Sequence, residues 1–434
     1  MTPERPSQEL PRLAFDEEQR LLGVGVRIQR RTGRHLVHLP ELERSAAALL
    51  DPVGDIVSRR LAALRRRLWR APGWLARLHA NGLSPDDLGR LDDLEHFPIL
   101  TREELAAAWA DFTDLGETAD PELHLATTSG SGGVPLLVPR SGYDGLHMWA
   151  VLRFWVARLG VELPARPRLV LLCTLPGGLE YSVRAPQFHR GALHRISTVR
   201  PRALERLHRA RPAILSTDPA GLHWLLAQER LPRPALVVSS ASHLAAPLRQ
   251  AATGALGAPI VNYIGATETG PIAWECLVEP GRFHVLHPDV SVRSRDGWLD
   301  VTRLRDSPLP LVRYRTGDRG EVVEVPCACG APGPSIVGFG GREACPFVRP
   351  DGTTVDAWTL AWLFKDIPLV GFQLAQVGRQ DFHLALDAAP ALGVDLLVLR
   401  LRLALRRAGF PDPTVIATIR PSTQPTKPRP FLPL

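Results

Sequence analysis

Apolar and polar positions follow different periods along the chain, and the changes of period divide the sequence into regions. Over residues 40–110, apolar residues recur every three to four positions, which predicts helices joined by loops. From about residue 145 to 340, short apolar runs such as RLVLLC and ALVVSS alternate with helical patterns such as DPAGLHWLLAQER. This alternation is typical of an α/β fold with a mostly parallel sheet. Within that region, residues 283–325 contain short strands and an Asp-Gly turn, which predicts an antiparallel β subdomain.

Local signals refine this division at both ends. Ser84 and Thr101 each precede proline or acidic residues in the pattern of a helix start. The glycine cluster at 338–341 precedes a segment with the strand-like run FHLALDA and the helical run DLLVLRLRLALRRAG. We therefore predict a large α/β domain over residues 1–340, with layered sheets and the β subdomain. A small α+β domain over residues 341–434 is expected to follow on a mobile hinge.

Composition limits the classes of protein to which the chain can belong. Its 434 residues are 45% hydrophobic and 22% charged, as in globular proteins. No apolar run reaches the roughly 18 residues that cross a bilayer. The polar N-terminus lacks the hydrophobic region of a signal peptide. We therefore expect a cytoplasmic protein with no membrane partner.

The positive charge of the chain comes almost entirely from arginine. The formal net charge is +7, and only Lys365 and Lys427 among the 52 basic residues are lysine. Such a bias indicates the base composition of a genome more than a nucleic-acid surface. The densest basic run, at 59–70, places three leucines on one helical stripe and predicts a solvated amphipathic helix. A helix that binds a polyanion is the alternative.

The stretch TTSGSGGVP, residues 127–135, consists of small hydroxyl residues and glycines before its final Val-Pro. It has no side chain large enough to pack, so it forms either a turn or a close backbone contact with a ligand such as phosphate. It is neither a Walker A loop nor a nucleophile elbow. Its backbone amides and hydroxyls could wrap the β- and γ-phosphates of a nucleotide. The residues predicted to do so are Thr128, Ser129, Gly130, Ser131 and Gly133.

Two later turns carry complementary chemistry. In VNYIGATETGP, residues 261–271, the Thr267 hydroxyl could meet an α-phosphate and the Glu268 carboxylate could hold Mg²⁺. In LVRYRTGDRGEV, residues 311–322, Asp318 could accept hydrogen bonds from two vicinal ribose hydroxyls. Each stretch alone could be an ordinary turn. Together with the glycine-rich loop, in this order, they predict a nucleotide site.

The cysteines indicate a metal site rather than disulfides, which are rare in a cytoplasmic chain. Cys327 and Cys329 form a short chelating pair on a turn. Cys276 is followed by two histidines, His284 and His287. Three cysteines and one histidine would form a closed tetrahedral set for structural Zn²⁺.

These motifs resemble those of the adenylate-forming superfamily, and most closely its phenylacetate–CoA ligase-like branch. The resemblance runs from about residue 70, through FPILTREEL, to the C-terminus. The family's Thr-Ser-Gly-Ser-Thr-Gly-x-Pro loop corresponds to residues 128–135, and its Tyr-Gly-x-Thr-Glu motif to residues 264–268. Its Tyr-Arg-Thr-Gly-Asp motif is intact at residues 314–318, and the following Gly-Arg pair that ends in Arg342 resembles the hinge. Some members of the branch also carry a zinc site of the kind described above.

The resemblance implies an AMP-forming ligase that uses ATP and Mg²⁺ in two half-reactions. A small carboxylic acid first attacks the α-phosphorus of ATP, giving an acyl adenylate and pyrophosphate. A CoA thiol, a carrier-protein thiol or an amine then displaces AMP. The family's catalytic lysine matches Lys427 in TKPRPF, and Thr267 and Glu268 would act with it.

The same resemblance assigns further contacts. The remaining nucleotide contacts would be Tyr263, Gly265, Ala266 and Arg342. The residues expected to contact the acid are Tyr143, Trp149, Tyr181 and Gly265. The three aromatic rings among them favour an aryl or other planar acid.

Several departures from the family pattern leave alternatives open. Gly132, Ile264 and Ser242 stand where the family usually has a threonine, an aromatic residue and an acid, and the C-terminal domain is short. A diverged member could instead activate nitrite with ATP for diazotisation of an aryl amine. A degenerate member could bind a nucleotide without turnover. Nucleic-acid binding on the arginine-rich helix ranks last, because that helix lacks interleaved aromatic residues. No feature of the sequence names the acid, the acceptor or the oligomeric state.

Overall fold

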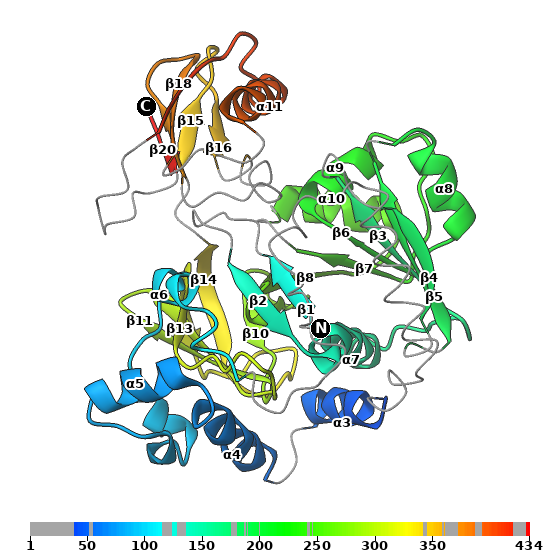
Figure 1. Ribbon diagram of the computed structural model, residues 1–434. Coiled ribbons are helices and arrows are strands. Elements are labelled where there is room, and N and C mark those ends of the chain that lie inside the picture. The colour runs from blue at the N-terminus through cyan, green and yellow to red at the C-terminus, as the bar shows by residue number, and fades with distance from the viewer. Residues whose placement is uncertain are drawn as a thin grey trace, which may run out of the picture.

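The computed structural model gives the arrangement of most of the chain (Figure 1). The residues that it describes are 39–51, 55–114, 124–127, 136–174, 180–185, 188, 190–198, 200–240, 244, 246–341, 345–357, 360, 372–386, 393–419 and 431–434. Within these segments, no helix combines the length and the apolar character that crossing a bilayer requires.

Short helices open the described part of the chain, as the spacing of its apolar residues predicts. Ser84 and Thr101 each close a capping box, in which side chains and backbone N–H groups pair reciprocally. Both predicted helix starts are therefore confirmed, although the first one begins only a short 3₁₀ turn. The helices are α3 (Leu39–Leu50), α4 (Ile56–Leu68), α5 (Pro72–Ala80), η2 (Pro85–Asp87), η3 (Leu91–Glu95) and α6 (Arg102–Ala107).

Helix α4 is the arginine-rich helix, and it differs in one respect from the prediction. Its leucine stripe is buried as expected, with Leu61, Leu64 and Leu68 at most 4% exposed. Two of its arginines, however, are only partly exposed and pair with aspartates. Arg60 forms an ion pair with the buried carboxylate of Asp289, and Arg67 binds both Asp114 and Asp306. These pairs join α4 to segments more than 40 residues away, which the helical period alone could not indicate.

A 12-stranded sheet forms the body of the molecule, and part of it is parallel as predicted. Strands β5, β3, β6, β7 and β8 lie side by side in this order, each parallel to the next. Helix α7 packs on one face of these strands, and α8, α9 and α10 pack on the other. The antiparallel strand β4 closes this edge of the sheet. The elements are α7 (Gly142–Arg158), β3 (Arg168–Cys173), β4 (Tyr181–Ala185), β5 (Gly191–Ser197), α8 (Ala203–Ala210), β6 (Ile214–Thr217), α9 (Pro219–Leu226), β7 (Leu236–Ser239), α10 (Ala246–Leu256) and β8 (Ile260–Ala266).

The rest of the large sheet is antiparallel, which confirms the predicted β subdomain. The Asp296-Gly297 turn joins β11 to β12, and both residues have positive φ, as a tight hairpin requires. A separate pair of antiparallel strands, β1 (His124–Thr127) and β2 (Leu137–Arg140), flanks the glycine-rich loop. The antiparallel strands of the large sheet are β9 (Gly270–Glu275), β10 (Phe283–Val285), β11 (Val290–Arg295), β12 (Trp298–Arg303), β13 (Tyr314–Val323) and β14 (Ser335–Gly341).

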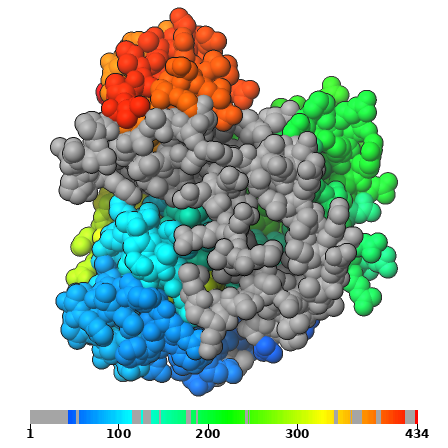
Figure 2. Space-filling view, viewed as in Figure 1, coloured from blue at the N-terminus to red at the C-terminus, as the bar shows by residue number. Residues whose placement is uncertain are grey.

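The C-terminal residues form a smaller α+β unit with a hydrophobic core of its own. Helix α11 packs on a four-stranded sheet of order β19-β18-β17-β20, and Leu401 and Phe382 are at most 1% exposed. Figure 2 shows this unit at one end of the molecule and the N-terminal helices at the other. The predicted α+β class is therefore confirmed, while a boundary at residue 340 stays a prediction. The elements are β15 (Pro346–Val348), β16 (Thr354–Asp356), β17 (Phe372–Gln376), β18 (Asp381–Leu386), α11 (Val394–Arg407), β19 (Thr414–Ile419) and β20 (Phe431–Leu432).

Candidate functional site

The turn that carries Thr267 and Glu268 joins β8 to β9 in an antiparallel pair. A Cβ atom at Gly265 would lie 2.9 Å from the carbonyl oxygen of Gly270, so the close approach of the two strands requires glycine there. Gly270 itself has a φ of +71°, a conformation that favours glycine. The tight turn leaves Gly265 exposed and Thr267 half-buried, while Glu268 is only 2% exposed.

Glu268 joins two of the motifs that the sequence singled out. The Tyr314 hydroxyl donates a hydrogen bond to Glu268 Oε1 at 2.6 Å. Arg102 Nη1 lies 3.4 Å from the same oxygen, and Arg102 belongs to the FPILTREEL stretch. Burial and the neighbouring carboxylate raise the pKa of Tyr314 well above its ordinary value, so its hydroxyl stays a proton donor. Neither contact uses Oε2 of Glu268.

Three arginines hold the backbone of the same turn. Arg140, Arg303 and Arg305 donate, in this order, to the three successive carbonyl oxygens of residues 267–269. The second and third of these bonds measure 2.8 and 2.9 Å. Hydrogen bonds from a charged donor are among the stronger ones in proteins. The orientation of the turn is therefore set by groups from β2, β12 and the segment after β12.

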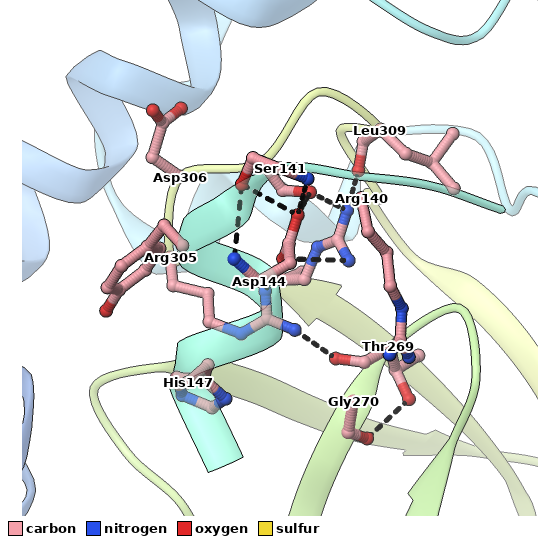
Figure 3. A network of polar contacts seen from close by, with 12 residues as sticks. Arg140, Ser141, Asp144, His147, Thr269, Gly270, Arg305, Asp306 and Leu309 are labelled. Carbon is pink, nitrogen blue, oxygen red and sulfur yellow. Dashed lines mark hydrogen bonds and ion pairs between the residues drawn. The ribbon is translucent and has the colours of Figure 1, made fainter. Parts of the chain in front are cut away.

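Asp144, near the N-terminus of α7, connects these arginines to that helix (Figure 3). Its carboxylate accepts a hydrogen bond from Arg305 at 2.8 Å and another from the Ser307 hydroxyl at 2.9 Å. It also accepts from the backbone N–H of Ser141 at 3.1 Å and so completes the capping box of α7. Burial alone would raise the pKa of Asp144, but the charges of Arg305 and Arg303 lower it to about 2.

A second buried aspartate, Asp289, lies near this network. His147 Nε2 is 2.5 Å from its Oδ2, and Arg60 pairs with its Oδ1. Burial opposes ionisation of Asp289, but Arg60 and His147 lower its pKa to about 2. The ordinary value is 3.8, so Asp144 and Asp289 stabilise the folded state above about pH 4 and lose that contribution as the pH falls towards 2.

This predicts how Asp289→Asn affects acid stability. At pH 6 we expect the variant to unfold with a free energy about 2 kcal/mol lower than that of the wild type. The difference should vanish near pH 2, because the protonated aspartic acid then resembles asparagine. Urea unfolding from pH 2 to 6 measures this difference. A constant gap across the whole range would show that ionisation of Asp289 contributes nothing to stability.

Asp318 lies on β13, four residues after Tyr314. The preceding Gly317 has a φ of +83°, and the Asp318 N–H donates to Thr316 Oγ1 at 3.1 Å. The turn-like backbone leaves the Asp318 side chain half-buried. Because Tyr314 contacts Glu268, the strand that carries Asp318 is tied directly to the turn at 267–269.

A cavity of about 470 Å³ contacts one of these motifs, the stretch that carries Thr267 and Glu268, through Asn262. Its lining includes Asn262 of β8, Phe283 of β10, and Val337 and Phe339 of β14. Tyr263 does not line it: its ring packs against Trp155 of α7, with the ring centroids 5.3 Å apart. Adjacent residues of a strand point to opposite faces, which explains why Asn262 and Tyr263 differ.

The aromatic residues predicted to contact an acid lie in different environments. The Tyr143 hydroxyl is hydrogen-bonded to Ser45 of α3. Trp149 is 7% exposed and packs against Phe188, with the ring centroids 5.2 Å apart, so it belongs to the hydrophobic core. Tyr181 lies on β4, and burial raises its pKa.

Several predicted site residues lie outside the described residues. The strands on either side of the glycine-rich loop pair antiparallel, with Thr127 opposite Leu137. Thr127 and Leu137, which are described, thus place the two ends of the loop on neighbouring strands. The predicted residues that are not described are Thr128, Ser129, Gly130, Ser131, Gly133, Arg342 and Lys427.

The predicted metal ligands, by contrast, are brought together. The ligand atoms of Cys276, His284, Cys327 and Cys329 all lie within 4.8 Å of one another. The Cys276 and Cys327 sulfurs are 3.6 Å apart, and Cys329 Sγ is 3.2 Å from His284 Nε2. Tetrahedral zinc with Zn–S bonds of about 2.3 Å separates two sulfurs by about 3.8 Å. These distances fit a Cys₃His zinc site, and the cluster includes His284 rather than His287.

Backbone N–H groups around the cluster are suited to stabilise Cys276 and Cys329 as thiolates. The backbone N–H groups of Val278 and Glu279 donate to the Cys276 sulfur at 3.4 and 3.3 Å, and that of Ala331 donates to Cys329 at 3.4 Å. Ser335 Oγ lies 3.3 Å from Nδ1 of His284 and so orients the imidazole with Nε2 towards the cysteines.

Sequence reasoning missed the arginines around the turn and their aspartate partner. Arg303 and Arg305 stand two residues apart next to SPLP, and Arg140 and Asp144 stand four apart after the glycine-rich loop. In a chain where arginine is so abundant, neither spacing stands out. The only available signal was the position of both pairs beside predicted motifs.

No protein-family model matches the sequence, and no curated protein matches it. Solved structures do match. A structure of 2-hydroxyisobutyryl-CoA ligase with 2-HIB-AMP and CoA in the thioesterification state is 16% identical, covers 88% of this chain and 91% of its own, and superposes with a TM-score of 0.55. An open conformation of the same ligase, also with 2-HIB-AMP and CoA, is 16% identical, covers 86% of this chain and 90% of its own, and gives a TM-score of 0.53. This chain has the adenylate-forming fold.

The resemblance read from the sequence motifs is therefore confirmed at the level of the fold. A third structure of the ligase, in the postadenylation state with R3-HIB-AMP, is 14% identical, covers 86% of this chain and 88% of its own, and gives a TM-score of 0.55. The match spans both the large and the small parts of the adenylate-forming fold. Identities of this size establish the fold alone, so the phenylacetate–CoA ligase-like branch stays a prediction.

Proposed function

We propose that this chain is an ATP-dependent, AMP-forming ligase that activates a small carboxylic acid as an acyl adenylate and transfers the acyl group to CoA. The observation that carries the proposal is the hydrogen bond between Tyr314 and Glu268. It joins the motif that would hold Mg²⁺ to the motif that would hold ribose. Two ordinary turns would have no reason to meet in this way. The likeness to CoA ligases over almost the whole chain supports the same conclusion.

In this proposal ATP contacts three stretches in turn, namely residues 127–135, 261–271 and 311–322. Its base enters the cavity beside Asn262, and Asp318 accepts hydrogen bonds from the two ribose hydroxyls. Thr267 lies at the α-phosphate, and the loop at 128–133 wraps the β- and γ-phosphates. Oε2 of Glu268 binds Mg²⁺, because Tyr314 and Arg102 both contact the other oxygen.

The chemistry then consists mainly of positioning and charge neutralisation. A carboxylate oxygen of the acid attacks the α-phosphorus, and the bond to the bridging oxygen of pyrophosphate breaks. The thiol of CoA, after loss of its proton, attacks the carbonyl carbon of the acyl adenylate, and AMP leaves. Lys427 stabilises the first transition state, in which negative charge gathers between acid and phosphate.

The acid is assigned from the aromatic residues and the acceptor from the matched structures. Tyr143 and Tyr181 favour a planar or aryl acid, while Trp149 supports the pocket from the core. CoA is the favoured acceptor because the matched ligase structures contain it. A carrier-protein thiol or an amine would require the same adenylate and differs only in the second step.

We also propose that Cys276, His284, Cys327 and Cys329 hold a structural zinc ion. Protein side chains would fill all four positions, which leaves none for a substrate. The ion would join the end of β9 to β10 and to the turn before β14, and so stabilise the antiparallel part of the sheet.

The test of the proposed function is pyrophosphate release from ATP and Mg²⁺ with a panel of aryl and small aliphatic acids. Release that a carboxylic acid triggers without any other addition would support the proposal, and the acceptor would then remain to be identified. Release that requires nitrite together with an aminoaryl acid would replace it with nitrite activation. Binding of ATP without release for any acid would favour a degenerate nucleotide-binding protein.

Asp318→Ala is expected to raise the KM for ATP by roughly tenfold or more, because two charge-assisted hydrogen bonds to ribose are lost. The kcat at saturating ATP should change less. Glu321→Ala is the matched control, since it removes an exposed carboxylate from the same strand. An ATP KM equal to that of the wild type would rule out the ribose contact.

A further inference from the structure

We propose that Arg140, Arg303 and Arg305 form an arginine clamp that sets the position of the turn at 267–269 for adenylation, with Asp144 as its anchor. This inference rests on the proposed function and adds positioning residues to it. None of the four residues belongs to the motifs through which the chain resembles known ligases.

The first argument is the pattern of hydrogen bonds. Three successive carbonyl oxygens of residues 267–269 each accept from a different guanidinium group. With all three carbonyls fixed, the peptide planes of the turn cannot rotate independently. The N–H of Ala266, which donates to Thr269 Oγ1 at 3.2 Å, closes the turn from within. The side chains of Thr267 and Glu268 therefore project from a backbone with little freedom.

The second argument is the way each guanidinium group is itself held. Arg305 donates to Asp144 with Nη1 and to the turn with Nη2. Arg303 donates to the turn with Nη1 and to the Ser307 hydroxyl with Nη2, at 2.6 Å. A planar guanidinium fixes the angle between its two acceptors, which a single ammonium group cannot do. Arg303 and Arg305 are 2% and 5% exposed, so protein surrounds both side chains and their hydrogen bonds.

The third argument is what the clamp connects. Arg140 ends β2, the strand that follows the glycine-rich loop, and Asp144 lies in the first turn of the next helix. The same short segment that follows the predicted β- and γ-phosphate site thus contacts the predicted α-phosphate and Mg²⁺ site. Catalysis by positioning requires the two sites to keep a fixed separation, and displacements of about 1 Å can cost roughly 100-fold in rate.

Charge supports the same assignment. Among the described residues, the carboxylates of Glu268, Asp144 and Asp306 lie near several guanidinium groups here. The guanidinium groups belong to Arg102, Arg140, Arg303 and Arg305. Guanidinium groups gathered beside a turn favour binding of a polyanion such as a triphosphate.

Arg305→Lys tests the clamp, because the lysine ammonium keeps the charge but cannot hold Asp144 and the turn at the fixed angle that the planar guanidinium sets. We expect the rate of acid-dependent pyrophosphate release to fall roughly 10- to 100-fold while the KM for ATP changes less than about threefold. The Mg²⁺ concentration for half-maximal rate should rise. Backbone amide hydrogen exchange should accelerate in the peptide that contains residues 262–276. Arg293→Lys is the matched control, since Arg293 also joins a carboxylate, that of Glu95, to a backbone carbonyl.

The outcomes separate the clamp from a purely structural role and from the proposed function. A lower thermal stability with unchanged kcat and unchanged exchange at 262–276 would overturn the clamp. If Arg305→Lys does not fold, Ser307→Ala takes its place. It removes only the hydroxyl between Asp144 and Arg303, and the same readouts apply. If the wild type releases no pyrophosphate with any acid, the proposed function fails, and hydrogen exchange alone then decides whether the clamp holds the turn.

Discussion

Replacing Lys427 with alanine is expected to reduce acid-dependent pyrophosphate release by roughly 100- to 1000-fold, the effect of removing one electrostatic stabiliser of a transition state. The chain uses arginine almost everywhere, and it has lysine at only two positions. A compact ammonium group differs from a guanidinium in size and geometry, so lysine at 427 indicates a requirement that arginine cannot meet. Pyrophosphate release under saturating ATP and acid measures the effect.

The sequence itself offers the control for this experiment. Lys365→Ala removes the other lysine and should leave the rate within about twofold of the wild type, because no motif places it at the site. Lys427→Arg keeps the positive charge and should still lose most of the rate. Equal rates for Lys427→Ala and Lys365→Ala would remove residue 427 from the reaction.

Cys327→Ser is expected to have the largest effect on stability. The variant should lose most of its zinc, and its Tm should fall by roughly 5 °C or more, because metal binding contributes directly to folding free energy. Cys173→Ser is the matched control, since Cys173 lies at the end of β3 and outside the cluster. Metal analysis and thermal unfolding of the same samples measure both quantities.

The zinc assignment also predicts the metal content of the wild type and the effect of a chelator on its Tm. Protein purified without chelators should contain close to one equivalent of zinc, and chelation should lower its Tm to about that of Cys327→Ser. Less than about half an equivalent in the wild type, or a Tm that chelators do not change, would contradict a structural zinc site.

The parts of the fold that follow from local pattern could be predicted. The runs RLVLLC and ALVVSS contain consecutive apolar residues because both faces of a parallel strand are covered by helices, and β3 and β7 show this arrangement. The Asp-Gly pair at 296–297 similarly indicated a hairpin, because both positions need positive φ.

The arginines of the site could not be predicted, and the reason is physical. A guanidinium group on a long side chain reaches acceptors far away in sequence, so Arg60 meets Asp289 and Arg305 meets Asp144. Nothing in the local period distinguishes such an arginine from a solvated one. Trp149 illustrates the same limit, because periodicity cannot separate a core position on α7 from a position in a pocket.

The cysteine cluster could be predicted only in part. The Cys-x-Cys turn is a local signal, but its partners come from strands that pair across the sheet. His284 lies opposite Trp274 on one side and Ser335 on the other, and this register directs its imidazole to the cysteines. The register depends on the whole sheet, so spacing alone favoured His284 and kept His287 as the alternative.

The ion pairs of α4 limit how far the chain can be shortened from its N-terminus without loss of stability. The family resemblance starts near residue 70, which would be an obvious place to cut the chain. Arg60 and Arg67 lie before that point, yet they neutralise Asp289 and Asp114, whose side chains are fully buried in the rest of the molecule. A fragment that starts at 70 would lose both guanidinium groups, and removing one partner of a buried ion pair is strongly destabilising. Shortened forms for crystallisation or expression should therefore begin upstream of α4.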